Sequence, residues 1–165
     1  MGLKKNFIYN SFLTLSQYII GLITFPYISR VLGVSNIGIV SFVDNTINYF
    51  ILFSTMGIGI MGAREIAKHR DDKEKLSAVF SSLVTLSLIF TTVVLFAYYI
   101  AINYIPQLNI YKELFYIGAS KLLFSVFLIE WFYRGIENFK YITIRNIFIK
   151  LLYVASLFIL IKTKD

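Results

Sequence analysis

The 165-residue chain contains no cysteine and one histidine, and only 15% of its residues are charged. Without cysteine it forms neither a disulfide framework nor a cysteine metal site. The histidine, His69, lies among mixed charges with no partner motif, so we expect no metal centre, no resident cofactor and no histidine-based catalysis. Soluble domains typically carry about 25% charged residues. Charge is therefore too scarce for a soluble domain of this length.

Hydrophobic residues make up 58% of the chain, and its mean hydropathy is +0.72. They gather in runs of about 20 residues, the helical length that crosses the roughly 30 Å core of a bilayer. The alternating pattern of membrane β-strands is missing. We therefore predict an all-α fold, a polytopic membrane helix bundle that forms a single transmembrane domain over residues 1–165. About five transmembrane helices are expected, at residues 7–29, 37–61, 76–105, 114–133 and 141–161.

Lysine and arginine fall unevenly between these spans. Nine lie on one side of the predicted membrane: Lys4, Lys5, Arg64, Lys68, Arg70, Lys73, Lys75, Arg134 and Lys140. Four lie on the other side: Arg30, Lys112, Lys162 and Lys164. Because cytoplasmic loops carry the excess of positive charge, the N-terminus is expected in the cytoplasm. The same bias explains the net charge of +7 and the pI near 9.5, so we expect no nucleic-acid partner.

The segment FPYISRVLGVSNIG, residues 25–38, separates the first two spans. Pro26 removes a backbone donor near the end of the first span and is expected to kink it. Gly33 is a helix-stop residue, and Ser35 and Asn36 are typical of a helix start. We predict a tight external turn here.

Three charged residues lie deep inside predicted spans: Asp44, Lys121 and Lys150. A charge near the centre of a bilayer costs several kcal/mol on insertion scales, so it needs a partner or polar surroundings. One interpretation is that Asp44 pairs with Lys121 or Lys150 and fixes helix packing. The other is that all three line a polar pathway.

Every predicted span also carries polar residues at helical spacing along one face, as Asp44 and Asn48 do. Any single stripe could be a hydrogen-bonded seam between helices. Five stripes together favour a shared hydrated interior, which Arg30 and Arg145 would extend toward opposite ends of the spans. Such an interior would be positive, and a positive cavity in a membrane suits an anionic head group.

Two further motifs have structural interpretations. Glu130 and Arg134 are four residues apart, which predicts an ion pair on a helix, with Trp131 as an anchor at the membrane interface. Gly57, Gly59 and Gly62 match the spacing GxGxxG, but a dinucleotide site requires a strand before the glycines. At the end of a membrane helix, these glycines indicate close helix packing or a bend.

Three blocks of sequence follow one another along the chain: PYISRVLG at 26–33, MGIGIMGAREIAK at 56–68 followed by a charged loop and LSAVFSS at 76–82, and WFYRGIENFKYITIRN at 131–146. Together they resemble the N-terminal part of bacterial polysaccharide biosynthesis proteins, the O-antigen flippases that move lipid-linked oligosaccharides. The order and spacing of the blocks carry the resemblance, which runs over nearly the whole chain. The family belongs to the multidrug/oligosaccharidyl-lipid/polysaccharide exporter superfamily.

The resemblance implies a transporter of two helical lobes in the bacterial cytoplasmic (inner) membrane. It implies that undecaprenyl-pyrophosphate-linked oligosaccharide moves across that membrane for surface polysaccharide biosynthesis. A cationic cavity between the lobes would receive the pyrophosphate, and Arg30 and Asp44 match positions where related flippases carry functional charges. Partners expected from the resemblance are the lipid-linked oligosaccharide, membrane lipids, and the polysaccharide polymerase and glycosyltransferase machinery.

About five spans are fewer than one six-helix lobe, so we expect a partial N-terminal lobe, a fragment of a longer protein. Two alternatives remain: a fragment of a multidrug-extrusion transporter, and a membrane assembly subunit that transports nothing. An enzyme is not expected, because the one candidate carboxylate pair, Asp71 and Asp72, lies in a solvated loop of mixed charge. Asp44 could couple transport to a proton or a sodium ion, because an intramembrane carboxylate can titrate or bind a cation.

Overall fold

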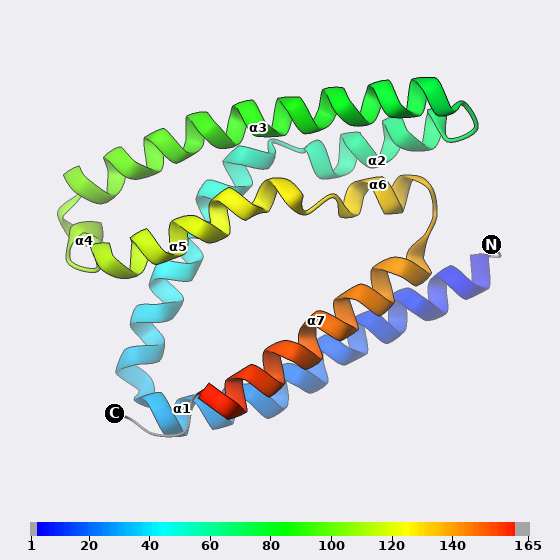
Figure 1. Cartoon of the computed structure of the whole chain (residues 1–165). Coiled ribbons are helices and arrows are strands. Elements are labelled where there is room, and N and C mark those ends of the chain that lie inside the picture. Colours follow the sequence, from blue (N-terminus) through cyan, green and yellow to red (C-terminus); the bar gives the residue numbers. More distant parts are fainter. Residues whose placement is uncertain (1–2, 161–165) are drawn as a thin grey trace. The chain divides into compact units, whose positions relative to one another are not determined.

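The structure, a computed structural model, describes the backbone of residues 3–160 and the side chains of residues 11, 12, 14–16 and 18–159. Every regular element in this part of the chain is helical (Figure 1), so the predicted all-α fold is confirmed. The α-helices are α1 (Leu3–Thr55), α2 (Ile58–His69), α3 (Lys73–Tyr104), α4 (Pro106–Asn109), α5 (Lys112–Phe124), α6 (Glu130–Gly135) and α7 (Phe139–Leu160). A 3₁₀ turn, η1 (Ser125–Phe127), follows α5 directly.

Four stretches of the described residues are long and apolar enough to cross a membrane: Thr14–His69, Lys73–Tyr104, Lys112–Gly135 and Phe139–Ile159. The first stretch overlaps both of the first two predicted spans. A break in helical geometry at Gly33 lies between those two spans, within α1. The polytopic character of the chain therefore agrees with the sequence.

The chain divides into two compact units, which are described separately. Unit 1 comprises residues 1–39 and 137–165, and unit 2 comprises residues 40–136. Unit 1 thus contains the first part of α1 together with α7. Unit 2 contains the end of α1 and all the elements from α2 to α6.

The predicted turn between the first two spans occurs at Gly33. Its φ of 77° and ψ of 159° belong to a region that is essentially restricted to glycine. The amide of Asn36 donates a hydrogen bond to the carbonyl of Leu32, 3.1 Å away, and so bridges the break. Pro26 lies inside helical backbone, seven residues before the break.

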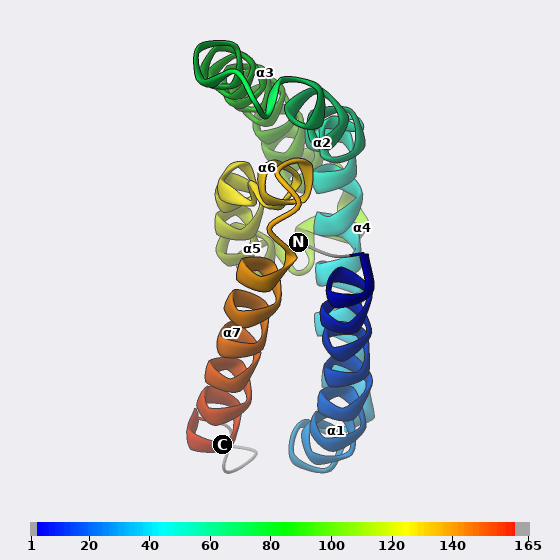
Figure 2. The same cartoon turned by 90° about the vertical axis from the view of Figure 1, so that its right-hand side faces the viewer.

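In unit 1, α7 and the first part of α1 run side by side in the same direction (Figures 1 and 2). The rings of Tyr27 and Phe158 contact each other with centroids 4.5 Å apart. Thr24 and Leu157, which are close in sequence to these two aromatic residues, are buried. These two helices correspond to the first and fifth predicted spans, and an alternating topology requires those two spans to share a direction.

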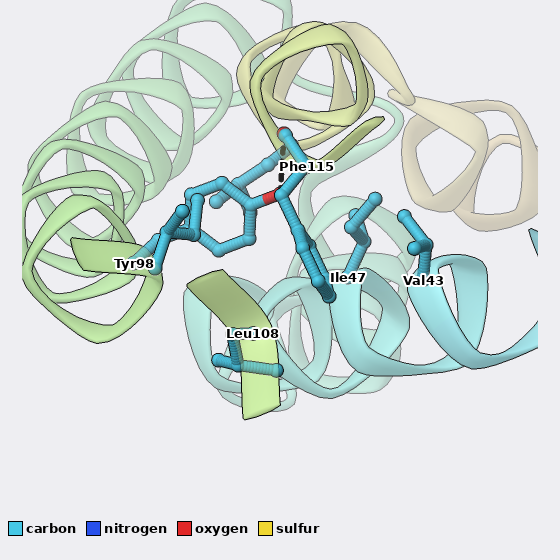
Figure 3. Close-up of a cluster of buried hydrophobic side chains, with 7 residues drawn as sticks. Val43, Ile47, Tyr98, Leu108 and Phe115 are labelled. Atoms are coloured by element: carbon cyan, nitrogen blue, oxygen red, sulfur yellow. Dashed lines mark hydrogen bonds between the residues drawn. The ribbon is translucent and has the colours of Figure 1, made fainter. Parts of the chain in front are cut away.

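One of the two hydrophobic clusters of unit 2 joins α1, α3, α4 and α5 (Figure 3). Figure 3 shows the ring of Tyr98 reaching from α3 toward Phe115 on α5, and its hydroxyl donates to the Phe115 carbonyl at 2.7 Å. The bond satisfies the only polar atom of the Tyr98 side chain, so the residue can be 1% exposed. This cluster ties α5 to the helix that carries Asp44. Its buried members are Val43, Ile47, Tyr98, Ile102, Leu108, Phe115 and Leu122.

The other cluster packs α2 against α3 and α6 and contains Ile58, Ile66, Leu83 and Trp131. Trp131 is only 8% exposed, so its predicted role as an interfacial anchor is wrong. The indole lies instead against Gly62, where an added Cβ would come within 2.8 Å of the ring. Sequence reasoning missed this because an aromatic residue beside an ion pair at a span end resembles an interfacial belt.

Two glycines of the GxGxxG pattern, Gly57 and Gly62, have the structural roles that the sequence indicates. Gly57 has a φ of 79° and lies at the bend between α1 and α2. Gly62 allows the close approach of Trp131, and Gly135 on α6 meets Ile66 and the carbonyl of Ala63 in the same way. A Cβ at Gly135 would lie 2.8 Å from that carbonyl oxygen. The α2–α6 contact therefore depends on glycine from both helices.

The fourth predicted span is not a continuous helix. Regular α-helix stops at Phe124, η1 continues to Phe127, and α6 begins only at Glu130. Leu128 and Ile129 lie outside the helices, although neither glycine nor proline is present to interrupt them.

Candidate functional site

Asp44, Asn48 and Lys121 form a polar network in unit 2. Asp44 and Asn48 lie one turn apart on α1, and Lys121 lies in the last turn of α5. The ammonium of Lys121 donates to Asp44 Oδ1 at 2.5 Å, and the amide of Asn48 donates to Asp44 Oδ2 at 3.1 Å. Both carboxylate oxygens are thus engaged. Of the two pairings that the sequence left open for Asp44, the structure contains the one with Lys121.

Gly118 is the residue that brings α5 close enough to α1 for this pairing. A Cβ at Gly118 would overlap the side chain of Ile47, which lies one turn beyond Val43 on α1. Gly118 precedes Lys121 by three residues and therefore shares its helix face. The sequence analysis missed Gly118. The one feature that could have indicated close helix packing there is that it is a small residue on the polar face of a membrane helix.

The network borders an apolar groove of about 190 Å³. Its walls are formed by Val40, Val43, Asp44, Ile47, Leu114, Ile117, Gly118 and Lys121. Asp44 and Lys121 are the two charged groups among otherwise apolar lining residues. The ion pair is therefore the polar feature that a molecule in this groove would meet.

The pair is open to its surroundings rather than enclosed in unit 2. The side chains of Asp44 and Lys121 are 50% and 45% exposed. Both residues belong to stretches apolar enough to cross a membrane, where direct contact of charge with lipid is costly. This face is therefore suited to a hydrated cavity or to other polar protein groups, and poorly suited to lipid chains.

In unit 1, Lys150 has no such partner. It lies in the middle of α7, and its ammonium nitrogen is buried without a hydrogen bond to any described group. Arg145, one and a half turns earlier, donates from Nε and Nη2 to the amide oxygen of Asn146 at 3.2 and 3.0 Å. Arg30 is exposed three residues before Gly33. The sequence-predicted site residues therefore fall into both units, and those of unit 2 form one network.

The charged loop between α2 and α3 consists of local ion pairs. Lys68 contacts Glu65 at 2.6 Å and Lys75 contacts Asp72 at 3.1 Å. Asp72 caps α3, and the backbone N–H of Lys75, followed by its ammonium group, lowers the pKa of the Asp72 carboxyl below its ordinary value. These contacts agree with the interpretation of a solvated loop.

The predicted pair of Glu130 and Arg134 is present on α6, with Nη2 2.6 Å and Nε 3.0 Å from Glu130 Oε1. Among the described residues, no three histidine or acidic side chains come close enough to hold a metal ion. The intramembrane charges are therefore the candidate functional groups in the part of the chain that the structure describes.

Comparison with known proteins identifies the family. The family model for "Polysaccharide biosynthesis protein" matches residues 3–165, so the chain belongs to that family. It is 27% identical over 165 residues to the protein named "Putative O-antigen transporter" from Escherichia coli (strain K12), and the match covers 100% of this chain and 40% of that protein. A protein with the same name from Shigella dysenteriae is 23% identical over 163 residues, covering 99% of this chain and 41% of the relative.

The chain thus spans about two fifths of the length of these curated relatives. No solved structure matches it. The resemblance noted in the sequence is confirmed at the level of the family.

Proposed function

We propose that the protein containing this chain is a flippase that moves undecaprenyl-pyrophosphate-linked oligosaccharide from the cytoplasmic to the outer leaflet of the bacterial inner membrane. The product would supply surface polysaccharide biosynthesis. The proposal is supported by membership of the polysaccharide biosynthesis protein family and by relatives named for O-antigen transport. Glycosyltransferases would assemble the oligosaccharide before this step, and the polysaccharide polymerase would act after it.

The observation that carries the proposal is the exposed ion pair of Asp44 and Lys121 in an apolar part of the chain. A pair that only fixed packing would gain most from enclosure, where water cannot compete for its charges. Here both side chains are about half exposed, so Lys121 can exchange Asp44 for another anion. The pyrophosphate of a lipid-linked sugar is an anion with strong acceptor oxygens.

The balance of charge favours an anionic cargo over an organic cation. Lys121, Arg145 and Lys150 are cations beyond the first turn of the apolar helices α5 and α7, whereas Asp44 is the acid of the site. A multidrug-extrusion transporter that carries organic cations would be expected to have more acidic than basic groups in its pathway. A subunit that only assembles other proteins has no need for cations at these depths, because each one costs free energy in the membrane.

Asp44 is also the group through which a cation gradient could drive transport. Binding of a proton or a sodium ion to its carboxylate would weaken the contact with Lys121 and free that ammonium for cargo. Substitution by asparagine keeps the shape and the hydrogen bond to Asn48 but removes the charge. Transport by the Asp44→Asn variant should therefore lose its dependence on the ion gradient.

The proposal is tested by changing both lysines to alanine in the protein that contains this chain. In cells whose only copy carries Lys121→Ala and Lys150→Ala, we expect lipid-linked oligosaccharide to accumulate in the inner leaflet and surface polysaccharide to fall at least tenfold. Lys112→Ala is the matched control, because Lys112 is an exposed lysine at the start of the same helix as Lys121. Normal transport by the double variant, at normal protein level, would remove both lysines from the pathway.

A further inference from the structure

A second groove in unit 2 lies away from the Asp44–Lys121 network and has a volume of about 400 Å³. It is lined by Lys73, Leu76, Ser77, Phe80, Ile129, Phe132 and Tyr133. The volume is in the range of pockets that hold small organic ligands. The lining comes from the first two turns of α3, from the non-helical residue Ile129, and from α6.

The interrupted fourth span creates one wall of this groove. Because regular helix stops before Leu128 and resumes at Glu130, Ile129 and Phe132 face the beginning of α3. Phe80 supports the inner end, where its ring centroid lies 5.1 Å from that of Phe132 and 5.7 Å from that of Trp131. The inner end of the groove is thus aromatic and apolar.

The other end of the groove is polar and begins with Lys73, the first residue of α3. Ser77 lies one turn further along the same face, and both side chains are exposed. The chain enters α3 from the charged loop that contains Asp71 and Asp72, so Lys73 lies where an apolar span meets water. The groove therefore changes from cationic to apolar along its length.

Lys73 differs from the neighbouring cations in having no protein anion. Lys68, Lys75 and Arg134 each contact a carboxylate within 3.1 Å. Lys73 makes no ion pair or side-chain hydrogen bond with any described residue, and neither does the Ser77 hydroxyl. Two donors at the mouth of an apolar groove are therefore available to an anion whose remainder is apolar.

We propose that this groove binds an anionic phospholipid of the surrounding membrane. The phosphate would contact the ammonium of Lys73 and the hydroxyl of Ser77, and one acyl chain would lie along Leu76, Phe80 and Phe132. The membrane supplies such molecules at the required depth, and basic pockets at the ends of membrane helices are suited to anionic head groups. The groove shares no lining residue with the groove at Asp44 and Lys121, and the proposal does not depend on the proposed transport function.

The lipid preference can be measured by native mass spectrometry of the delipidated protein that contains this chain. Titration with phosphatidylglycerol should give a bound population that phosphatidylcholine with the same acyl chains does not match. Lys73→Gln should weaken phosphatidylglycerol binding about fivefold, which corresponds to the roughly 1 kcal/mol of one basic residue at an anionic membrane surface. Lys75→Gln is the matched control, because Lys75 is equally near the surface but pairs with Asp72 and lies outside the groove. Equal losses in both variants would mean nonspecific surface attraction and would overturn the proposal.

A second measurement identifies the occupant. Because this chain has no native cysteine, Ser77→Cys introduces the first thiol of the chain, at the mouth of the groove, and the labelling is measured with any cysteines of the remaining protein replaced by serine. Phosphatidylglycerol should slow labelling of this thiol by an apolar maleimide, and phosphatidylcholine should not. If labelling is blocked without any lipid, another part of the protein covers the groove. If undecaprenyl pyrophosphate displaces phosphatidylglycerol at equal concentration, the occupant is the carrier lipid. Either result would contradict the assignment to phospholipid.

Discussion

Two lysines of this chain lie in apolar helices and have opposite surroundings. Lys121 is 45% exposed and contacts Asp44 at 2.5 Å. Lys150 has a buried ammonium nitrogen without a hydrogen-bond partner among the described residues. The first lysine is compensated and accessible, whereas the second is neither.

The difference shows that a charge in a membrane helix can be retained for two reasons. Lys121 stabilises the packing of α5 on α1 through Asp44, and its exposure leaves it able to bind a further anion. Lys150 makes no ion pair with any side chain that the structure describes, and burial of an uncompensated ammonium opposes folding. A residue whose burial opposes folding is a candidate for function.

The largest expected effect on stability comes from removing the compensated lysine. Lys121→Met leaves the carboxylate of Asp44 without its cation, so we expect the unfolding temperature of the purified protein to fall by a few degrees. The half-exposed geometry keeps the loss below that of a buried pair. A thermal-shift measurement in detergent checks this, with Lys112→Met as the control. An unchanged unfolding temperature would mean that the pair does not stabilise the fold.

The same substitution at Lys150 should raise the unfolding temperature instead of lowering it. Lys150→Met replaces an unpaired buried ammonium with an apolar side chain of similar length, so the unfolding temperature should rise by about 2 °C. Transport should nevertheless decrease if Lys150 contacts the cargo. A fall in the unfolding temperature as large as that of Lys121→Met would show that Lys150 has an anionic partner in the whole protein. The contrast between a paired Lys121 and an unpaired Lys150 would then be wrong.

A smaller effect is expected at Gly118, which sets the distance between the helices of the pair. In Gly118→Ala the new methyl group must displace the flexible end of Ile47, so the loss of stability should be less than about 1 kcal/mol. Cross-linking of Asp44→Cys to Lys121→Cys should slow in the Gly118→Ala background. Gly59→Ala is the control, since nothing lies within 4 Å of a Cβ at Gly59. Equal cross-linking rates in the two backgrounds would remove Gly118 from the control of this distance.

The smallest effect concerns a charge outside the membrane. The pKa of Asp72 is lowered below its ordinary value of 3.8 by hydrogen bonds from Lys75. Its contribution to stability is therefore present above pH 3.8 and is lost as the pH falls through the lower folded-state pKa. Unfolding temperatures of the wild type and Asp72→Ala should differ at pH 6, and the difference should become smaller as the pH falls below 3.8. A difference that is constant with pH would show that the carboxylate charge is not involved.

The sequence predicts the helical class well, because this depends on local composition and on the thickness of a bilayer. It left open whether Asp44 pairs with Lys121 or Lys150, since helix register depends on packing between distant residues. Here that packing is the approach of Ile47 to Gly118. Periodicity along one helix contains no information about such a contact.

The break at Leu128 and Ile129 and the groove beside it could not be predicted for a similar reason. The segment LLFSVFLIEWF contains no glycine or proline, so no local residue requires an interruption. The burial of Trp131 against Gly62 depends on α2, almost seventy residues away in sequence. Long-range packing therefore overrides the local helical preference of this span.

The most direct test of the proposed flippase site is to exchange the two charges of the ion pair. Asp44→Lys combined with Lys121→Asp keeps one acid and one base in contact and should restore the normal level of folded protein in the membrane. We expect transport of lipid-linked oligosaccharide by this double variant to remain at least tenfold below that of the wild type, because the ammonium that receives the anionic cargo has moved from α5 to α1. Wild-type transport by the exchanged pair would contradict the proposal and would mean that Asp44 and Lys121 serve only to hold the helices together.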